Sequence, residues 1–525
     1  MKTRLVAGLF AIGAGIVLAL LLGYTHVATR IGALLSPDAA QAAPAPAPAP
    51  VPPTMVGITL STLNFYTAEW PFNDLIQSTG TLLYLSPRSW DPLDGKVKLD
   101  ATGHPVDVPA GTRLMVILQK GTLKLPLGTY NCRISPGWTV SPYGNWQMSG
   151  SGTSFRMKIN NPEPGREAGV GLILTAQRSN AALTELSCRP VDDTGALFNP
   201  TFLADLKPYR VLRFMDWMHA NNAPPRKWSS RPTPAFFSQA GPEGVAIEYI
   251  VALVNAAKAD PWINLPLDAD EQYYRNLAIY VRDHVDRDRH IYVELSNEVW
   301  NTTFEQGKLA TARGQARYPG VPADKANDFY YADRVRETMV IWSEVFAGQP
   351  GRLVRVLSSQ AVSPRRAEQA LDHKETWKSV DALATAPYFG VSGNEIAASG
   401  SARVDAVFAN SAQIVDRAIG FARAGKAVAR AHGLRYITYE GGPGFQSFRP
   451  GVAQDMIALN HDQRLYGMYM QYLRRWRSEI GDLLMVLGSM STPSVAGGSY
   501  GHQDYTGQPL ADAPKARAVS DFVKQ

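Results

Sequence analysis

Two glutamates are candidate catalytic groups because each ends a short apolar segment that leads directly into a loop. Glu298 lies in residues 291–300, which read IYVELSNEVW, and Glu440 lies in residues 436–443, which read YITYEGGP. Continuous apolar runs of this length are typical of buried parallel strands. In parallel α/β barrels the carboxyl ends of the strands carry the catalytic groups. The sequence therefore predicts two carboxyl groups at one edge of a barrel.

A pair of carboxyl groups in this position could cleave a glycosidic bond. In a retaining mechanism the two groups lie about 5 Å apart across the sugar. One is protonated and donates to the leaving oxygen, while the other is ionised and attacks the anomeric carbon. Their proximity raises the pKa of one group and so separates the two roles. The alternative is that Glu298 and Glu440 are ordinary glutamates at loop edges.

The elements that must position these carboxyls alternate between strands and helices along the chain. Helical patterns, for example at residues 273–285, 330–346 and 405–431, separate the apolar runs. Such alternation favours a parallel sheet, and eight runs favour a (β/α)8 TIM barrel formed by residues 56–79 and 191–525. The candidate strands are residues 56–61, 210–214, 262–265, 290–295, 354–357, 382–386, 436–439 and 483–487.

The pair Asn297-Glu298 at the fourth candidate strand and Glu440 at the seventh resemble the motifs of clan A glycoside hydrolases. These are retaining glycosidases with a TIM barrel. The resemblance covers residues 56–66 and 198–525. It implies that Glu298 is the acid/base and that Glu440 is the nucleophile. It also implies that Asn297 bonds the sugar 2-hydroxyl, whereas a turn-forming asparagine is the alternative.

Arg213 and Tyr388 are further candidates by the same resemblance, since they end the second and sixth candidate strands. The clan commonly places an arginine and a tyrosine there, close to the nucleophile. A guanidinium would keep Glu440 ionised through a charge-assisted hydrogen bond. A salt bridge from Arg213 to Glu294 is an alternative that could coexist with this contact. For Tyr388 the alternative is an aromatic residue at the rim that contacts sugar.

Several side chains near the strand ends could bind a polysaccharide. Aromatic rings can stack on pyranose rings, although each ring on its own could equally belong to the core. By strand alternation we also expect Glu294, Ser296 and Glu298 to share one face. The aromatic and polar candidates are Trp217, His219, Trp228, Trp262 and Trp300, with Asp216 and Asn221 or Asn222 as polar partners.

Two features depart from the clan. Many members have a histidine two residues before the sixth-strand tyrosine, and here that residue is Ala386. Many have a tryptophan at the end of the eighth strand, and residues 487–492 contain none. These differences leave the paired carboxyls in place and indicate an unfamiliar branch rather than a standard cellulase.

Residues 80–190 have a different sequence pattern, in which short apolar segments are separated by Gly, Pro, Asn and Ser. This pattern predicts an antiparallel, β-sandwich-like module in or beside the first strand-helix connection. The chain has two cysteines, Cys132 and Cys188, and both lie in this module. In an exported protein we expect them to form one disulfide rather than a metal site. The sequence also leaves open that the module binds a partner protein in a polysaccharide secretion machinery.

The N-terminal residues predict export. Residues 1–35 contain Lys2 and Arg4 followed by an uncharged apolar stretch at 5–28, which suits an uncleaved signal anchor or a cleaved signal peptide. Residues 36–55 are rich in Ala and Pro and predict an extended spacer. Either interpretation places the remainder of the chain in the periplasm or at the cell surface, tethered or secreted.

Composition narrows the function further. Of the 525 residues, 45% are hydrophobic and 19% are charged, which is typical of a globular enzyme. The net charge of +6 is dispersed without a basic run, so nucleic acid is a poor candidate partner. No metal cluster or nucleotide motif is evident, and we expect no cofactor. We therefore expect a retaining, endo-acting glycoside hydrolase on β-glucan or exopolysaccharide, with transglycosylation and non-catalytic polysaccharide binding or assembly as the alternatives.

Overall fold

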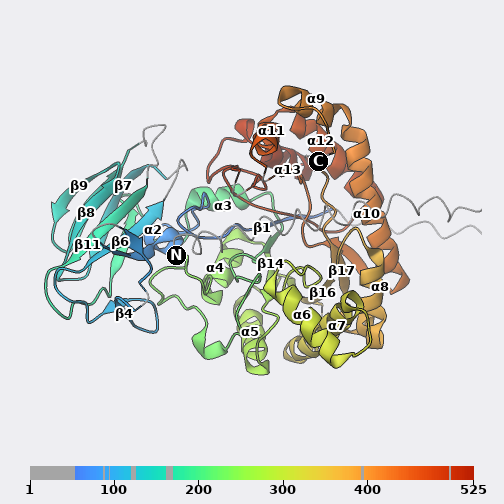
Figure 1. Ribbon diagram of the computed structural model, residues 1–525, viewed down its shortest axis with the longest axis horizontal. Helices are drawn as coiled ribbons and strands as arrows, with labels where there is room; N and C mark the ends of the chain where they lie inside the picture. Colours follow the sequence, from blue (N-terminus) through green and yellow to red (C-terminus); the bar gives the residue numbers. More distant parts are fainter. Residues whose placement is uncertain are drawn as a thin grey trace, which may run out of the picture.

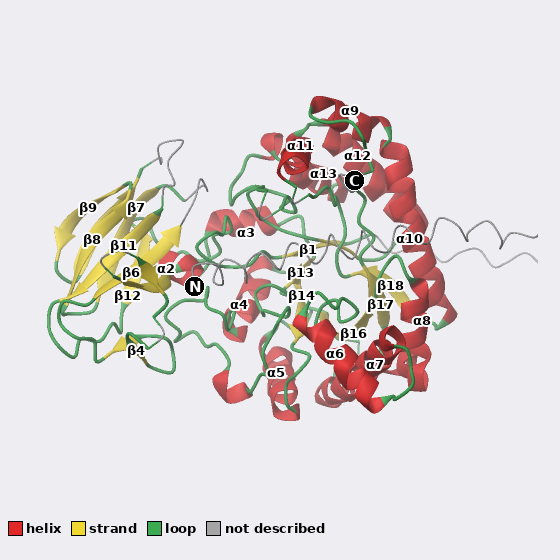
Figure 2. Cartoon of the chain, viewed as in Figure 1, coloured by secondary structure: helices red, strands yellow, loops and turns green. Residues whose placement is uncertain are grey.

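The computed structural model describes residues 54–525 except 87–88, 94, 120–125, 161–168, 350, 392–394, 448 and 496–497. The predicted signal or anchor segment at 1–35 and linker residues 36–53 lie outside the described residues. Two bodies make up the described chain, a helix-covered barrel and a β-rich module beside it (Figure 1). Helices surround the strands of the barrel, whereas the module consists mainly of strands (Figure 2).

The barrel contains eight parallel strands, and all eight correspond to the strands predicted from the sequence. From β1 to β18 each strand pairs with the next barrel strand in chain order, and the last strand, β19, pairs with β1. At the remaining seam the Thr438 amide donates to the Leu483 carbonyl at 3.1 Å. The strands are β1 (Val56–Thr59), β13 (Val211–Arg213), β14 (Asp260–Leu265), β15 (Ile291–Leu295), β16 (Leu353–Ser358), β17 (Ala382–Thr385), β18 (Arg435–Thr438) and β19 (Leu484–Val486).

Alternate residues of the strands face two different cores. In β14, Trp262 belongs to the cluster that fills the barrel interior, whereas Ile263 packs outward toward the helices. Gly57 of β1 is required by close packing, because a Cβ atom there would lie 2.2 Å from the Met485 Sδ atom. The interior is therefore filled with side chains, as expected for a barrel of this size.

Helices cover the outside of the barrel. One helix predicted over residues 405–431 is instead two, α9 and α10, that meet at Asn410. The Asn410 side chain donates to the Ala406 carbonyl at 2.8 Å, a local bond that competes with helix continuation. The main helices are α3 (Pro200–Leu206), α4 (Ile247–Ala257), α5 (Glu271–His284), α6 (Glu305–Arg317), α7 (Ala323–Val345), α8 (Pro364–Asp372), α9 (Ser401–Ala409), α10 (Ser411–Ala431), α11 (Pro450–His461), α12 (Arg464–Arg475) and α13 (Pro514–Val523).

The β-rich module is inserted between β1 and α3 and has two antiparallel sheets around one core. Trp70 and the short helix α2 (Leu75–Thr79) also pack in this core, so the module extends beyond residues 80–190. One sheet contains β12 (Leu186–Pro190), β7 (Gly128–Ile134), β10 (Ser154–Ile159) and β9 (Trp146–Ser151). The other sheet contains β3 (Trp90–Asp91), β2 (Thr81–Leu85), β6 (Arg113–Gln119), β11 (Val170–Ala176) and β8 (Trp138–Gly144). Two further short strands, β4 (Lys98–Leu99) and β5 (Pro105–Val106), pair with each other.

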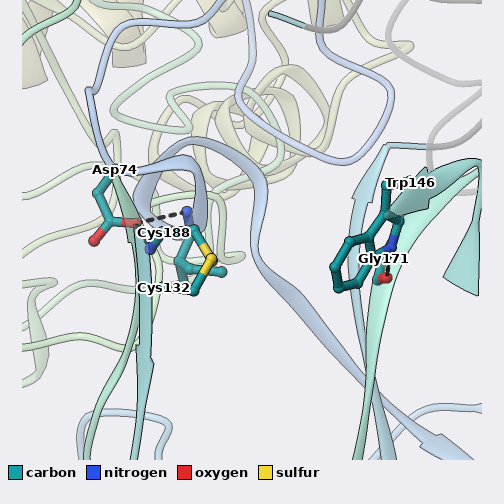
Figure 3. Close-up of a disulfide and its surroundings, with 6 residues drawn as sticks. Asp74, Cys132, Trp146, Gly171 and Cys188 are labelled. Carbon is teal, nitrogen blue, oxygen red and sulfur yellow. Dashed lines mark hydrogen bonds between the residues drawn. A yellow bond between two sulfur atoms is a disulfide. The ribbon is translucent and has the colours of Figure 1, made fainter. Parts of the chain in front are cut away.

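Cys132 and Cys188 form a disulfide between directly opposed positions of β7 and β12, with an S–S distance of 2.09 Å (Figure 3). The Cys188 amide donates to the Asp74 carboxylate at 3.0 Å, which ties α2 to the same strand. The Trp146 indole of one sheet donates to the Gly171 carbonyl of the other at 2.8 Å. These contacts lock the two sheets and the entry helix together.

The module also holds a loop of the barrel. Phe237, in the loop between β13 and α4, is buried in the module's core. Its amide donates to the Thr102 carbonyl at 3.0 Å, and the Gln239 amide donates to the Gln77 carbonyl at 3.1 Å. The β13–α4 loop is therefore braced by the module at one end and continues into the barrel at the other.

Candidate active site

Glu298 and Glu440 lie beyond the carboxyl ends of β15 and β18, the fourth and seventh strands of the barrel. Their exposed fractions are only 3% and 1%. Carboxyl groups with so little contact with water must be paired, hydrogen-bonded or protonated. The surroundings of each group therefore decide which of them carries charge.

Both oxygens of Glu440 accept strong hydrogen bonds. Arg213 Nη1 donates to Oε1 at 2.8 Å, and the Tyr388 hydroxyl donates to Oε2 at 2.7 Å. These donors favour the ionised carboxylate and fix its orientation. The contacts expected of Arg213 and Tyr388 by resemblance are both present in this geometry.

Arg213 serves a second carboxylate as well. Its Nε and Nη2 atoms donate to Glu294 Oε2 at 3.1 and 2.8 Å, so the alternative salt bridge coexists with the Glu440 contact. Trp262 Nε1 and Asn264 Nδ2 donate to the same Glu294 oxygen at 2.9 and 2.7 Å. Arg213 and Glu294 are completely buried. This network fixes the guanidinium beneath Glu440.

Glu298 is held differently, by neutral donors. Asn301 Nδ2 donates to Oε2 at 3.0 Å, and the Tyr439 hydroxyl donates to Oε1 at 3.2 Å. The expectation that strand alternation runs from Glu294 to Glu298 is wrong, because β15 ends at Leu295. Ser296 and Glu298 have positive φ angles of 65° and 41°, so the backbone turns into the site there.

The electrostatics of the two carboxyls differ as acid and nucleophile require. Burial and the charge of Glu440 raise the pKa of Glu298 to about 8. Burial also raises the pKa of Glu440, but Arg213 and the Tyr388 hydroxyl oppose this rise. Two coupled carboxyls of this kind share a proton near neutral pH. The proton rests on Glu298 because the guanidinium favours the charged form of Glu440.

Asn297 joins this network from the turn after β15. Its Oδ1 accepts from Arg213 Nη2 at 2.8 Å, and its Nδ2 donates to Asn221 Oδ1 at 3.1 Å. Gln306 Nε2 donates to the Asn297 carbonyl at 2.9 Å and to Asn221 Oδ1 at 2.7 Å. The side chain is thus oriented by the site itself, and it links β15 to the β13–α4 loop.

Two of the aromatic candidates do not lie where a sugar could stack on them. Trp262 has no exposed surface and lies in the barrel interior, stacked on Tyr292 with ring centroids 5.4 Å apart. Trp217 is 1% exposed, and its Nε1 donates to the Glu69 carboxylate at 3.1 Å. Both expectations are wrong because these side chains face the core. Trp300, directly after the Glu298 turn, is only partly buried.

Asp216 and His219 lie in the β13–α4 loop, and each is partly buried. Burial and the charge of Glu440 raise the pKa of Asp216 to about 7. Burial and the charge of Arg226 lower the pKa of His219 to about 4, so the imidazole is neutral at neutral pH. Both side chains can offer hydrogen bonds to a sugar without adding a fixed cation.

Sequence reasoning missed two residues near the site. Tyr500, in the loop after β19, has its ring centroid 6.3 Å from that of Tyr388, and burial together with the charges of both glutamates raises its pKa. Glu69 is completely buried and accepts from the Ser61 amide at 3.2 Å and from Ser489 Oγ, and burial raises its pKa to about 8. Each lies in an irregular loop without a periodic signal. In the part of the chain that the structure describes, no cluster of three or more His, Cys, Asp or Glu side chains suits a metal ion.

Comparison with known proteins gives only distant likenesses. No protein-family model matches the chain, and no curated protein matches it. Among solved structures, a GH51 arabinofuranosidase from Xanthomonas axonopodis pv. citri is 13% identical with a TM-score of 0.36, over 56% of this chain and 61% of that one. A monomeric β-xylosidase from Caulobacter crescentus CB15 is 14% identical with a TM-score of 0.35, over 61% and 64% of the two chains.

A GH10 xylanase with a bacterial Ig-like domain, from termite gut, is 10% identical with a TM-score of 0.34, over 74% of this chain and 94% of that one. Chains this distant and this loosely superposed give no information about activity. The chemistry of the site must therefore be inferred from its own geometry.

Proposed function

We propose that the protein is a retaining glycoside hydrolase with Glu298 as the acid/base and Glu440 as the nucleophile. The observation that supports this most strongly is the asymmetry of the two buried carboxyls. Glu440 accepts from Arg213 and Tyr388 and is kept ionised, whereas the donors to Glu298 among the described residues, Asn301 and Tyr439, are neutral, and the pKa of Glu298 is raised to about 8. An acid that retains its proton beside an ionised nucleophile is what double displacement requires.

In the proposed first step Glu440 attacks the anomeric carbon while Glu298 gives its proton to the leaving oxygen. The C–O bond of the glycosidic link breaks, and a glycosyl ester on Glu440 forms. Glu298, now ionised, then takes a proton from water as the water attacks the anomeric carbon, and the bond from that carbon to Glu440 breaks and releases the Glu440 carboxylate. Asn297 would bond the sugar 2-hydroxyl, and Tyr500 would offer an aromatic wall beside both glutamates, at the strand end where a tryptophan is missing.

The proposed substrate is a β-linked polysaccharide outside the cytoplasm, such as a β-glucan or an exopolysaccharide. The inference about location depends on residues 1–35 and 36–55, whose composition predicts export with a tethering segment and a spacer. Within the described residues, no helix is both long enough and apolar enough to span a bilayer. The proposed anchor lies outside that part of the chain.

Transfer of the glycosyl group to a sugar acceptor instead of water is a close variant, because the same two glutamates would carry it. A non-catalytic polysaccharide-binding protein is the more distant alternative. It would have no need of an oriented, ionised carboxylate beside a protonated one.

Product analysis tests the proposal. Residues 54–525 are incubated with a panel of β-glucans and the producing cell's own exopolysaccharide, beside a Glu440→Gln control, and the products are identified by mass spectrometry. We expect oligosaccharides from the wild type only. Intact polymer throughout, together with measurable polymer binding by both proteins, would favour the binding-protein alternative.

A further inference from the structure

A small cavity lies between the β13–α4 loop and helices α4 and α5, outside the catalytic pair. Its volume is about 20 Å³, little more than one water molecule needs. The walls include Met218, Arg226, Trp228, Glu243 and Tyr273. The cavity is too small for a sugar ring but large enough for the tip of a polar substituent.

Arg226 is the unusual residue in this cavity, because its guanidinium has no ion-pair partner among the described residues. The side chain is 91% buried, with a 9% exposed fraction, and it forms no salt bridge with any described residue. Its Nη1 donates only to the Glu243 carbonyl at 3.3 Å, and its buried Nη2 has no hydrogen-bond partner within the described chain. A buried guanidinium without an anion is costly, so such a group is retained where an external anion completes it.

The other charged groups at the cavity do not satisfy Arg226. Arg231 lies over the Trp228 ring at 4.3 Å and is already paired with Glu248 at 2.7 Å. Glu243 also lines the cavity and accepts from Arg226 through its backbone carbonyl, yet no ion pair between the Glu243 carboxylate and Arg226 exists among the described residues. Among the described residues, the Arg226 guanidinium therefore has no ion-pair partner, and it lines the cavity together with the partly buried Trp228.

The cavity belongs to the same loop as the catalytic site. Met218 and Arg226 flank His219 and Asn221, and Asn221 contacts the catalytic-turn residue Asn297. The Arg226 amide donates to the Asp268 carbonyl at 2.9 Å, which fixes this part of the loop against the segment after β14. A polymer bound across the strand ends could therefore place a substituent of a remote sugar unit at this cavity.

We infer that the Arg226 cavity binds the carboxylate of an acidic sugar unit, so that the substrate polymer contains uronic acid or a carboxylate-bearing substituent. This inference rests on the proposed function and specifies the substrate class. One carboxylate oxygen would accept from the unpartnered Arg226 Nη2, and the attached ring would lie outside the cavity beside Trp228, whose other face Arg231 covers.

The test uses wild-type residues 54–525 and two probes, methyl β-D-glucuronide and methyl β-D-glucoside, with binding measured by calorimetry. We expect the wild type to bind the glucuronide about tenfold more tightly, as a charge-assisted bond provides. Arg226→Met should abolish this preference and leave glucoside binding unchanged. Lys227→Met removes the same charge from the exposed neighbouring residue and should retain the preference.

Three outcomes would overturn the inference. The first is that the wild type binds both probes equally tightly. The second is that Arg226→Met loses affinity for the glucoside as much as for the glucuronide. The third is that sodium sulfate displaces the glucuronide as readily as glucuronate does at matched ionic strength. Thermal melting of each variant separates unfolding from a binding defect, because glucuronate should raise the midpoint of the wild type but not of Arg226→Met. Glycan cleavage is measured separately, so failure of the hydrolase proposal and failure of the cavity inference give different results.

Discussion

At the scale of single residues, Arg213 determines how charge is distributed in the site. It is one cation in contact with two buried carboxylates, Glu294 and Glu440. The three groups together leave one excess negative charge near Glu298. Burial raises the pKa of both Glu298 and Glu440, and of the three glutamates only Glu298 has no cationic donor within the described part of the chain. The site therefore stores its proton on Glu298.

The Tyr439 hydroxyl allows this proton to be tested by pH dependence. It donates to Glu298 and so favours the ionised form, which lowers the pKa of that carboxyl. Wild-type kcat/KM should fall as pH rises through about 8, where Glu298 loses its proton. Tyr439→Phe removes the donor, raises the pKa further and should move this basic limb to higher pH. A limb that stays fixed or moves to lower pH would contradict the assignment of Glu298 as the acid.

At the scale of elements, the strands could be predicted from sequence because each is a continuous apolar run, and the two glutamates mark where runs end. The orientation of side chains beyond those ends could not. Ser296 and Glu298 have positive φ angles, so the alternation of side chains along a strand no longer applies there. In the sequence, Trp217 and Trp262 cannot be distinguished from tryptophans at the surface. Only the packing of the barrel shows that both side chains are buried.

The loop after β19 shows how a distant element completes the site. Lys515 of α13 is 4% exposed, and its ammonium donates to the Ser499 carbonyl at 2.8 Å and to Asn460 Oδ1 at 3.0 Å. Ser499 directly precedes Tyr500, so the buried lysine anchors the residue that lies beside both glutamates. No sequence pattern connects α13 with Tyr500, and this contact could not be predicted.

Lys515→Met tests the anchor. Burial lowers the pKa of Lys515 to about 7, so between about pH 7 and the ordinary lysine pKa of 10.5 the unfolded chain binds more protons than the folded chain. The contribution of Lys515 to the free energy of unfolding should therefore rise with pH across that window. Urea unfolding of the wild type at pH 6.5 and pH 9 should show this rise in the free energy of unfolding, and Lys515→Met should abolish it.

Without the anchor, we also expect KM to rise more than kcat falls, because Tyr500 loses its fixed position. Lys524→Met, at an exposed residue just beyond the end of α13, is the matched control and should change neither property. A pH-independent difference in stability together with unchanged KM would show that Lys515 does not position Tyr500.

At the scale of the whole molecule, the β-rich module and the barrel are linked through the β13–α4 loop. That loop carries Asp216 and His219, and Phe237 at its far side is 7% exposed within the module's core. Sequence texture predicted a separate β-sandwich-like module at residues 80–190. It could not show that a barrel residue completes the module's core, since that depends on long-range packing.

Phe237→Ala should weaken this link. Loss of a buried phenylalanine costs about 3–5 kcal/mol where the cavity cannot collapse, so we expect a lower midpoint in thermal unfolding. We also expect a several-fold higher KM for polymer, because the loop on which the sugar-binding candidates lie is no longer braced. Leu127→Ala, at a 55% exposed residue of the same module, is the control. A lower midpoint with unchanged KM would limit the module to a structural role.

The most direct test of the whole account is to trap the glycosyl ester. Glu298→Gln is mixed with a nitrophenyl glycoside of the sugar identified by product analysis, whose leaving group needs no acid. The first step should proceed while the second stalls, because no base remains to activate water. Peptide mass spectrometry should then find one glycosyl unit attached to Glu440. Steady turnover without any adduct, or an adduct on another residue, would contradict the assignment of Glu440 as the nucleophile.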